Sequence, residues 1–214
     1  SYAASIGSTH VTDKSLNMLS MYLKDFYAIS VREYTSELLL SSIGIKCQTV
    51  SDPVFLLEKK FWDVFAKAPG NLKKHYILVY LLRLDERIIA QANKYAKEHN
   101  IKLYYIHPMG VQVNKLKGKR IRGVGPEEFV WLIRNADKVF TNSFHAVAFC
   151  AIFNISFFHV NQEELGNRVS DLLKSLKAIE QDNGEYKVKV NSNEFINMIS
   201  ESKRFLDESI GALE

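Results

Sequence analysis

Short apolar runs alternate with amphipathic segments along most of the chain. Apolar runs of a few residues between polar or turn residues are typical of buried strands, and apolar residues spaced three or four apart are typical of helices packed on a sheet. Strands are expected at 2–6, 28–31, 46–50, 75–82, 101–106, 139–141, 155–158 and 186–190. Helices are expected at 15–24, 35–43, 58–66, 85–99, 126–135, 168–177 and 193–213, with another opening at residue 144. This alternation predicts an α/β fold with a mostly parallel, Rossmann-like sheet and right-handed crossovers.

One segment, KAPGN at 67–71, is the best candidate for a linker, because Pro-Gly is a strong turn signal. After it the strand–helix alternation restarts with the apolar run HYILVYLL. We therefore expect a division near residue 70, with 1–69 forming one α/β part and 70–214 a second, Rossmann-like domain.

The run from 138 to 158, KVFTNSFHAVAFCAIFNISFF, carries the clearest candidate site. It predicts a buried strand, a polar corner at Asn142 and Ser143, and a helix that begins at Phe144 and His145. In open α/β sheets ligands bind outside the carboxyl ends of the strands, and the first turn of a helix favours an anion. His145 is thus either a proton donor beside an anion site or a structural histidine at a helix start.

Three further residues occupy predicted strand ends or helix starts. Arg32 follows the strand at 28–31 and could bind a carboxylate or phosphate through two hydrogen bonds, or form a surface ion pair with Glu33 or Glu37. Asp52 could orient a base or accept from a sugar hydroxyl, or it could only form an Asp-Pro turn. Arg168 opens a helix, where a cation opposes the helix dipole and an anionic partner would offset that cost.

Composition narrows the class of protein. The content of 47% hydrophobic and 24% charged residues is ordinary for a soluble globular protein. No run of 18 apolar residues predicts a transmembrane helix, and no signal peptide is visible at the start of the chain. Cys47 and Cys150 have no metal-ligand spacing and are expected as buried thiols, so we predict no metal site and a cytoplasmic, reducing location.

A basic run follows the strand at 101–106, with five positive charges at Lys115, Lys117, Lys119, Arg120 and Arg122. Together with the net charge of +4 it permits two interpretations: a solvated loop, or contact with a diphosphate acceptor or an anionic membrane surface. Nucleic acid is not expected as a partner, because no recognised module is present and aromatic residues do not interleave with the run. A P-loop, a dinucleotide fingerprint and a nucleophile elbow are absent from the sequence.

The segment TNSFHAVAFCAIFNISFF resembles the signature of the polysaccharide pyruvyl transferase family, in which a T-x-S-F-H-G-x-x-F run precedes a short helix and a strand. Similar segments follow the family's order over nearly the whole chain to about residue 176. They are SYAASIG, ISVREYTSELLLSSIGIK, SDPVFLL, VGPEEFVWLIRNADKVFTNSFH and GNRVSDLL. Two departures are visible: Ala146 replaces the family's Gly, and the family's further N-terminal α/β half, expected before SYAASIG, has no counterpart here.

The resemblance implies a glycosyltransferase-B-like architecture, of which this chain would hold the second half and the end of the first. It implies transfer of pyruvate from phosphoenolpyruvate to two hydroxyls of a sugar or lipid-linked oligosaccharide as a ketal, with release of phosphate and without a cofactor. His145 would be the acid, Arg32 and Arg168 would anchor the donor, and Asp52, Asn142, Ser143 and Phe144 would bind substrate. The alternatives are a sugar-nucleotide-dependent glycosyltransferase of the same architecture and a non-catalytic sugar-binding remnant.

Overall fold

The computed structural model describes residues 1–7, 11–70, 72, 74–107, 113–160, 168–181, 184–188 and 193–212. The chain divides into two units, here called the first and the second unit. The first comprises Ser1–Leu57, Gln162–Leu176 and Asn191–Glu214, and the second comprises Glu58–Asn161 and Lys177–Val190. The chain first changes unit at Leu57–Glu58, ahead of the linker at 67–71, and the division expected near residue 70 stays a prediction.

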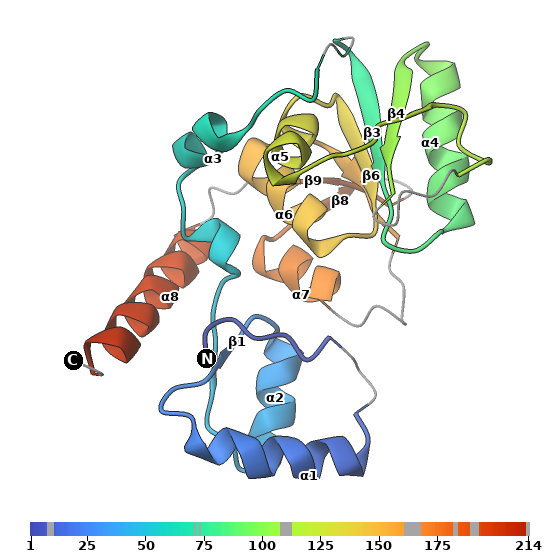
Figure 1. Cartoon of the computed structure of the whole chain (residues 1–214). Helices are drawn as coiled ribbons and strands as arrows, with labels where there is room; N and C mark the ends of the chain where they lie inside the picture. The colour runs from blue at the N-terminus through green and yellow to red at the C-terminus, as the bar shows by residue number, and fades with distance from the viewer. Residues whose placement is uncertain are drawn as a thin grey trace. The chain divides into compact units, whose positions relative to one another are not determined.

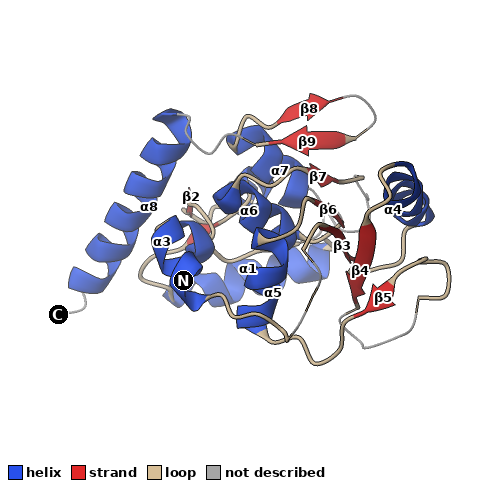
Figure 2. Ribbon diagram, turned by 90° about the horizontal axis from the view of Figure 1, so that it is seen from above, coloured by secondary structure: helices blue, strands red, loops and turns tan. Residues whose placement is uncertain are grey.

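The second unit is built on a sheet of seven described strands, in the order β5-β4-β3-β6-β7-β9-β8 (Figure 2). Its strands are β3 (Tyr76–Tyr80), β4 (Lys102–Ile106), β5 (Lys119–Arg120), β6 (Lys138–Thr141), β7 (Phe157–Phe158), β8 (Ile179–Gln181) and β9 (Glu185–Lys187). The five strands from β5 to β7 run parallel, and the β8–β9 hairpin adds an antiparallel edge beside β7. The fold is therefore the mostly parallel α/β sheet that the sequence predicts.

Helices cover both faces of this sheet, with α4 on one face and α5 and α6 on the other (Figure 1). The helices of this unit are α3 (Lys59–Phe65), α4 (Glu86–Glu98), α5 (Pro126–Arg134) and α6 (Phe144–Phe153). Buried apolar side chains of α4, among them Ile88 and Ala92, pack in one cluster with Ile77, Val79 and Phe140 of the sheet. Alternate strand residues such as Tyr76 face the opposite layer, where the Tyr76 hydroxyl donates to the carbonyl of Leu132 in α5 at 2.8 Å.

Helix α6 is apolar on all sides and lies in the core, unlike an ordinary amphipathic surface helix. Of its ten residues, all described, eight are buried, Ile152 is half-buried and only His145 is exposed. Asn154 ends the helix in the left-handed conformation at φ 57°, which Asn tolerates better than most residues. His145 is therefore the one side chain of α6 that is exposed to solvent, while the others pack wholly or partly in the core.

The first unit contains a smaller parallel sheet, in which β1 (Ser30–Val31) pairs with β2 (Gln48–Thr49). Its helices are α1 (Asp13–Tyr22), α2 (Tyr34–Ser42), α7 (Arg168–Ser175) and α8 (Asn193–Gly211), with short 3₁₀ turns η1 (Leu23–Asp25) and η2 (Pro53–Phe55). The strand expected at 2–6 is only an extended segment that joins β1 through a single bridge between Ala4 and Val31. A left-handed Ala3, at φ 50°, interrupts the regular strand geometry there.

Other differences from the sequence-based expectations lie at the edges of the larger sheet. The loop expected at 109–123 contains the edge strand β5, and β8 was not expected at all. Gly118 explains how β5 reaches its place, because a Cβ there would lie 2.5 Å from the Leu103 carbonyl oxygen. The turn expected at 182–184 lies mostly outside the described residues. Of the two cysteines, Cys150 is buried as expected, whereas Cys47 is only half-buried.

The described helices are each too short or too polar to cross a lipid bilayer.

Candidate active site

The order of strands in the second unit reverses at a defined place. From the central strand β3 the chain moves outward to β4 and β5, then returns to the other side of β3 to form β6 and β7. At such a reversal the loops after the two central strands turn apart, and ligands of open α/β folds bind there. The reversal lies between the carboxyl ends of β3 and β6, and Asn142 and Ser143 directly follow β6.

Asn142 spans this reversal with its side-chain amide. Its Oδ1 accepts from the backbone N–H of Leu82 at 2.9 Å, and its Nδ2 donates to the carbonyl of Arg83 at 2.8 Å. The preceding Thr141 donates its hydroxyl to the carbonyl of Tyr80 at 2.6 Å. Because Asn142 is buried and both ends of its amide bind backbone, it fixes the shape of the loop after β3.

Ser143 and His145 occupy the start of α6, as the sequence predicts. Ser143 is the N-cap, and its Oγ accepts from the backbone N–H of Ala146 at 3.4 Å. His145 is exposed on the first turn, with its ring edge-on to Phe144 at a centroid distance of 5.4 Å. Ala146 is completely buried, so the methyl group that distinguishes it from glycine packs in the core. The first turn of α6 therefore presents an imidazole next to the crevice.

A second histidine, not among the residues predicted from the sequence, lies at this edge of the sheet. His159 directly follows β7, it is 5% exposed, and its Nδ1 lies 3.1 Å from the carbonyl oxygen of Thr141. Burial lowers the pKa of His159, and the Thr141 carbonyl and the Asp85 carboxylate oppose that shift only in part. The signal that could have revealed it is the one used for His145, a polar residue immediately after a buried strand.

The first unit places Arg32 and Asp52 together at the carboxyl ends of β1 and β2. Arg32 Nη1 contacts Asp52 Oδ2 at 2.5 Å, and its Nε donates to Glu33 Oε1 at 3.2 Å. The buried Glu33 carboxylate also accepts from the hydroxyls of Ser5 at 2.7 Å and Ser36 at 3.1 Å. Arg32 thus forms the ion pair with Glu33 that the sequence left open, and Asp52 as a second partner holds its guanidinium between two carboxylates.

Asp52 also keeps its turn-forming role, since its Oδ1 accepts from the backbone N–H of Val54 at 3.1 Å and caps η2. Arg168 begins α7 as expected. Its guanidinium lies beside Gly7, where a Cβ would be 3.8 Å from the central guanidinium carbon. Gly7 follows the extended segment that bridges β1, so Arg168 reaches the same edge of the small sheet as Arg32.

The seven predicted site residues therefore form two groups. Those in the second unit lie between β6 and the first turn of α6, and those in the first unit lie at the carboxyl edge of its small sheet. Their assigned roles stay predictions. Glu33 joins the second group although it was not predicted as a site residue, because the burial of its carboxylate is visible only in the folded structure.

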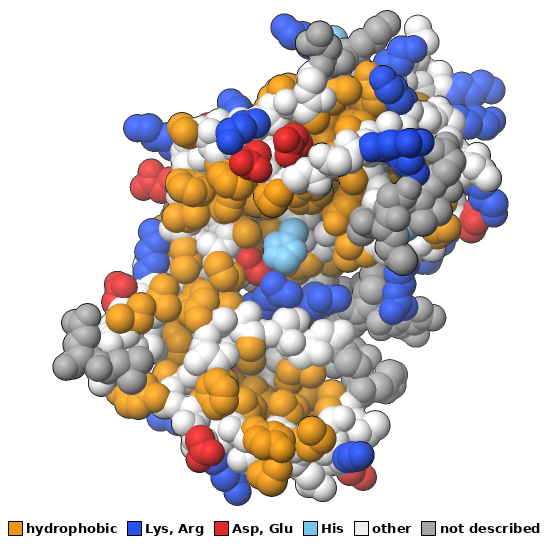
Figure 3. Space-filling model, viewed as in Figure 1, with side chains coloured by type: hydrophobic (Ala, Val, Ile, Leu, Met, Phe, Trp, Pro, Cys, Tyr) orange, Lys and Arg blue, Asp and Glu red, His pale blue; other side chains and the backbone are white. Residues whose placement is uncertain are grey.

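The basic run is partly ordered by contacts of its own. Lys115 Nζ lies 2.6 Å from Glu86 Oε1, and the carbonyl of Lys115 accepts from Asn93 at 2.8 Å. Lys119 and Arg120 form the edge strand β5. Figure 3 shows Lys and Arg side chains gathered on the flank of the second unit that carries β4 and β5. The run is thus a folded basic edge of the sheet and not only a loop.

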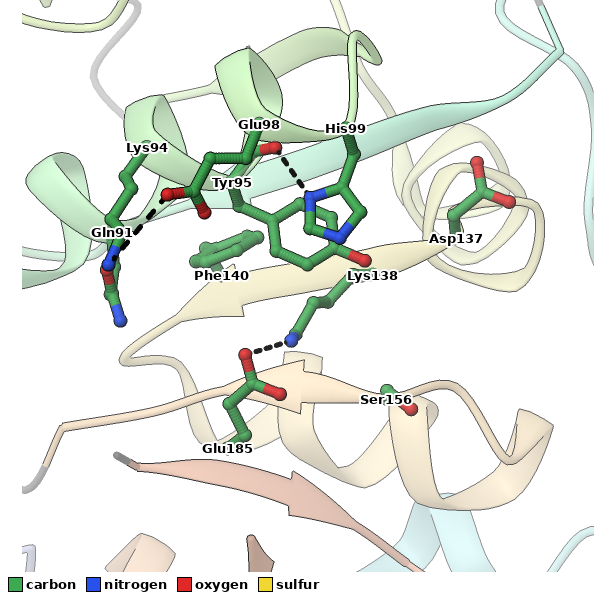
Figure 4. Close-up of a pocket in the computed structure, with 10 residues that line it drawn as sticks. All are labelled: Gln91, Lys94, Tyr95, Glu98, His99, Asp137, Lys138, Phe140, Ser156 and Glu185. Atoms are coloured by element: carbon green, nitrogen blue, oxygen red, sulfur yellow. Dashed lines mark hydrogen bonds and ion pairs between the residues drawn. The ribbon is translucent and has the colours of Figure 1, made fainter. Parts of the chain in front are cut away.

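A polar hollow of about 510 Å³ lies at the opposite, amino edge of the same sheet (Figure 4). Lys138, the first residue of β6, is 5% exposed in its side chain and pairs there with Glu185. Its ammonium also lies 4.6 Å from the centre of the Tyr95 ring, which stacks on His99. Glu185 thus neutralises the buried Lys138 ammonium in this hollow.

The described residues contain no group of His, Cys, Asp and Glu side chains arranged to hold a metal ion.

Comparison with known proteins gives a family and a fold. The family model for polysaccharide pyruvyl transferase matches residues 1–164. A search of curated proteins finds no significant match. The solved structure of UDP-N-acetylglucosamine 2-epimerase from Rickettsia bellii is similar with a TM-score of 0.55 and 10% identity, over 98% of this chain and 67% of that chain.

A second solved structure, UDP-GlcNAc 2-epimerase from Methanocaldococcus jannaschii in complex with UDP-GlcNAc and UDP, has a TM-score of 0.47 and 13% identity. That match covers 85% of this chain but only 61% of the solved one. At such identities the likeness to the Rickettsia protein shows the fold alone. It confirms the predicted glycosyltransferase-B-like architecture.

Proposed function

The chain belongs to the polysaccharide pyruvyl transferase family, and we propose that it transfers pyruvate from phosphoenolpyruvate to a sugar. The acceptor would be a sugar of a surface polysaccharide or its lipid-linked precursor, and the product would be a ketal with two of its hydroxyls. No cofactor is needed, because the enol phosphate of the donor is itself the activated group.

The observation that carries this proposal is the position of His145. It is the one exposed residue of a helix otherwise given to core packing, and it lies next to the crevice between β3 and β6. In the proposed reaction the imidazolium of His145 gives its proton to the methylene carbon of the donor, and C2 becomes cationic. A sugar hydroxyl attacks C2 and gives its proton to a base. Phosphate then leaves with the electrons of its C–O bond, a second hydroxyl attacks C2, and its proton passes to His145, which restores the imidazolium.

Arg32 and Arg168 are our proposed anchors for the two anionic groups of the donor. The two carboxylates that contact Arg32 hold its guanidinium in a fixed orientation, which suits bidentate recognition of a carboxylate or phosphate. Asp52, also in the first unit, is the proposed hydrogen-bond acceptor for a hydroxyl of the sugar. In the second unit, Ser143, Asn142 and Phe144 would support binding by shaping the corner that presents His145.

The proposed location is the cytoplasm, with the basic edge around β5 available for a diphosphate-linked acceptor or for the inner membrane surface. Exposed Lys side chains near an anionic surface each contribute about 1 kcal/mol. The exposed Lys115–Glu86 pair would compete with such contacts only weakly, because surface ion pairs are worth little.

A second candidate is a sugar-nucleotide-dependent glycosyltransferase. The fold shared with an epimerase whose name contains a UDP sugar favours it, since the same crevice could bind a nucleoside diphosphate. A non-catalytic sugar-binding protein is a third candidate. The three differ in what is released: phosphate from phosphoenolpyruvate, UDP from a UDP sugar, or neither.

The experiment measures phosphate release from phosphoenolpyruvate, and UDP release from UDP-hexoses, in the presence of a panel of methyl glycosides. We expect phosphate release that falls about 100-fold or more in His145→Gln, the contribution typical of a general acid. His75→Gln is the matched control, because His75 is an exposed histidine of the same unit outside the crevice. Equal turnover in His145→Gln and the wild type would remove His145 from the mechanism, and UDP release without phosphate release would favour the second candidate.

A further inference from the structure

The imidazole of His159 has one nitrogen committed and the other without a partner. Its Nδ1 lies 3.1 Å from the Thr141 carbonyl oxygen, at the end of the neighbouring strand β6. Its Nε2 is buried and has no hydrogen-bond partner among the described residues. A buried polar atom without a partner costs free energy, and a hydrogen bond donated to Nε2 would remove that cost.

The hydrogen bond to Thr141 determines which nitrogen of the His159 ring carries the hydrogen. A carbonyl oxygen can only accept, so Nδ1 must carry the hydrogen and donate it. Burial favours the neutral ring, as the lowered pKa indicates. In the neutral ring with a hydrogen on Nδ1, the nitrogen Nε2 carries a lone pair and can only accept.

The ring sits where strand order reverses. His159 is attached to the end of β7, and its Nδ1 reaches the last residue of β6. The carboxylate of Asp85, on the loop that follows β3, is near enough to influence its charge. The imidazole therefore lies between groups that follow three adjacent strands, at the carboxyl edge of the sheet that also carries His145. On the remaining side, its backbone N–H donates to Gly184 at 3.1 Å and its ring lies 6.5 Å from that of Tyr186.

We propose that Nε2 of His159 accepts a hydrogen bond from a hydroxyl of a sugar bound in the crevice between the carboxyl ends of β3 and β6. This inference rests on the proposed function, because it assigns the acceptor side of that reaction. When the hydroxyl oxygen bonds to C2 of the donor, its proton passes to Nε2, while the proton gained by the donor's methyl carbon comes from His145. His145 then acts as the acid and His159 as the base, and both lie at one edge of the sheet.

The chemistry of the site selects a hydroxyl over other ligands. Phosphoenolpyruvate in its ionised form has no O–H or N–H group to donate to a lone pair, so its anionic groups do not fit Nε2. A cationic amine is disfavoured because the Asp85 carboxylate, which could otherwise attract it, already pairs at 2.7 Å with Arg87 in the first turn of α4. A neutral hydroxyl satisfies Nε2 without either conflict.

Two variants separate binding from a merely structural role. His159→Asn keeps an amide N–H near the position of Nδ1, so it can still donate to Thr141, but it has no acceptor in place of Nε2. His159→Phe loses both groups. If His159 only supports the end of β6, the Asn variant should behave like the wild type and the Phe variant should not.

The test follows the ¹⁵N resonances of the histidine rings as methyl glycosides of common hexoses and N-acetylhexosamines are added to the whole chain. We expect a hexoside to shift the Nε2 resonance of His159, and phosphoenolpyruvate alone to leave it unchanged. His159→Asn should weaken binding of that hexoside about tenfold or more while phosphoenolpyruvate affinity is kept, because one buried hydrogen bond is lost.

The inference is overturned if no member of the panel shifts Nε2, or if His159→Asn binds the hexoside as the wild type does. Either result would mean that Nε2 binds a buried water at most, and no sugar hydroxyl. Phosphate release measured on the same samples reports separately on the proposed function. Sugar binding at His159 without phosphate release would defeat the transferase proposal alone, and phosphate release with an unresponsive His159 would defeat only this inference.

Discussion

Asn142 and Leu82 are 60 residues apart in the chain, yet the Asn142 Oδ1 accepts from the Leu82 backbone N–H at 2.9 Å. This contact joins the loop after β3 to the corner before α6, across the reversal of strand order. It couples the shape of the crevice to the start of the helix that carries His145.

Replacing Asn142 should therefore affect both stability and the site. We expect Asn142→Ala to lower the free energy of unfolding by about 1–3 kcal/mol, because it removes the two hydrogen bonds that the buried Asn142 amide makes to Leu82 and Arg83. Urea denaturation measures this change. Asn142→Asp is the control, since it can still accept from Leu82 but cannot donate to Arg83. Its free energy of unfolding should lie between those of Asn142→Ala and the wild type. Identical denaturation midpoints for Asn142→Ala and the wild type would contradict the bridging role.

Arg32→Ala and Arg168→Ala should each weaken phosphoenolpyruvate binding by about 1.5–3 kcal/mol, the range for hydrogen bonds to charged groups. Isothermal calorimetry measures the affinity. Lys in place of either Arg should restore it only in part, because the planar fork is lost. Arg204→Ala, at a solvent-exposed Arg of α8 in the same unit, is the control and should bind normally.

Arg32→Ala needs a second measurement, since it also leaves Glu33 and Asp52 without their cation. Its denaturation midpoint distinguishes a lost ligand contact from a damaged fold. Unchanged affinity in both Arg→Ala variants would refute the anchoring roles.

Stability should fall on mild acidification because of His159. Burial lowers its pKa in the folded protein below the ordinary value of 6.5, so the unfolded chain binds a proton first as the pH drops. This contribution to stability is complete above pH 6.5 and is lost as the pH falls from 6.5 through the lowered pKa. Thermal denaturation across this range should show a steeper loss for the wild type than for His159→Asn. Parallel curves for the two proteins would contradict the prediction.

Neutralising Lys115, Lys117 and Lys119 together should leave phosphoenolpyruvate affinity unchanged. It should weaken binding to vesicles that contain anionic lipid, and wild-type binding should fall with added salt, because exposed charges are screened over about 8 Å at physiological ionic strength. Co-sedimentation with vesicles measures both effects. A variant with Lys59, Lys60 and Lys67 replaced, three exposed lysines on or after α3, is the matched control. Equal vesicle binding by the basic-edge variant and the wild type would leave the run as a structural edge of the sheet.

The sequence by itself determined the elements that local pattern controls. Apolar runs such as YILVY give β3, an Asp before an amphipathic segment gives the cap of α4, and a polar corner after a buried strand gives the start of α6 with His145 in its first turn. These features depend on residues close together in the chain, where alternation and capping are directly readable.

Tertiary structure alone decided how distant residues share hydrogen bonds and charge. The edge strand β5 exists because Gly118 allows close approach to Leu103, and the ladder partner that makes Lys119 and Arg120 a strand comes from β4. The form of the His159 ring is set by a carbonyl 18 residues away, on the neighbouring strand. Arg32 is held by Glu33, its neighbour in the chain, and by Asp52, which a separate strand brings to it. A hydrogen bond or ion pair requires both partners within about 3–4 Å, and for residues on different strands only the register of the sheet provides that proximity.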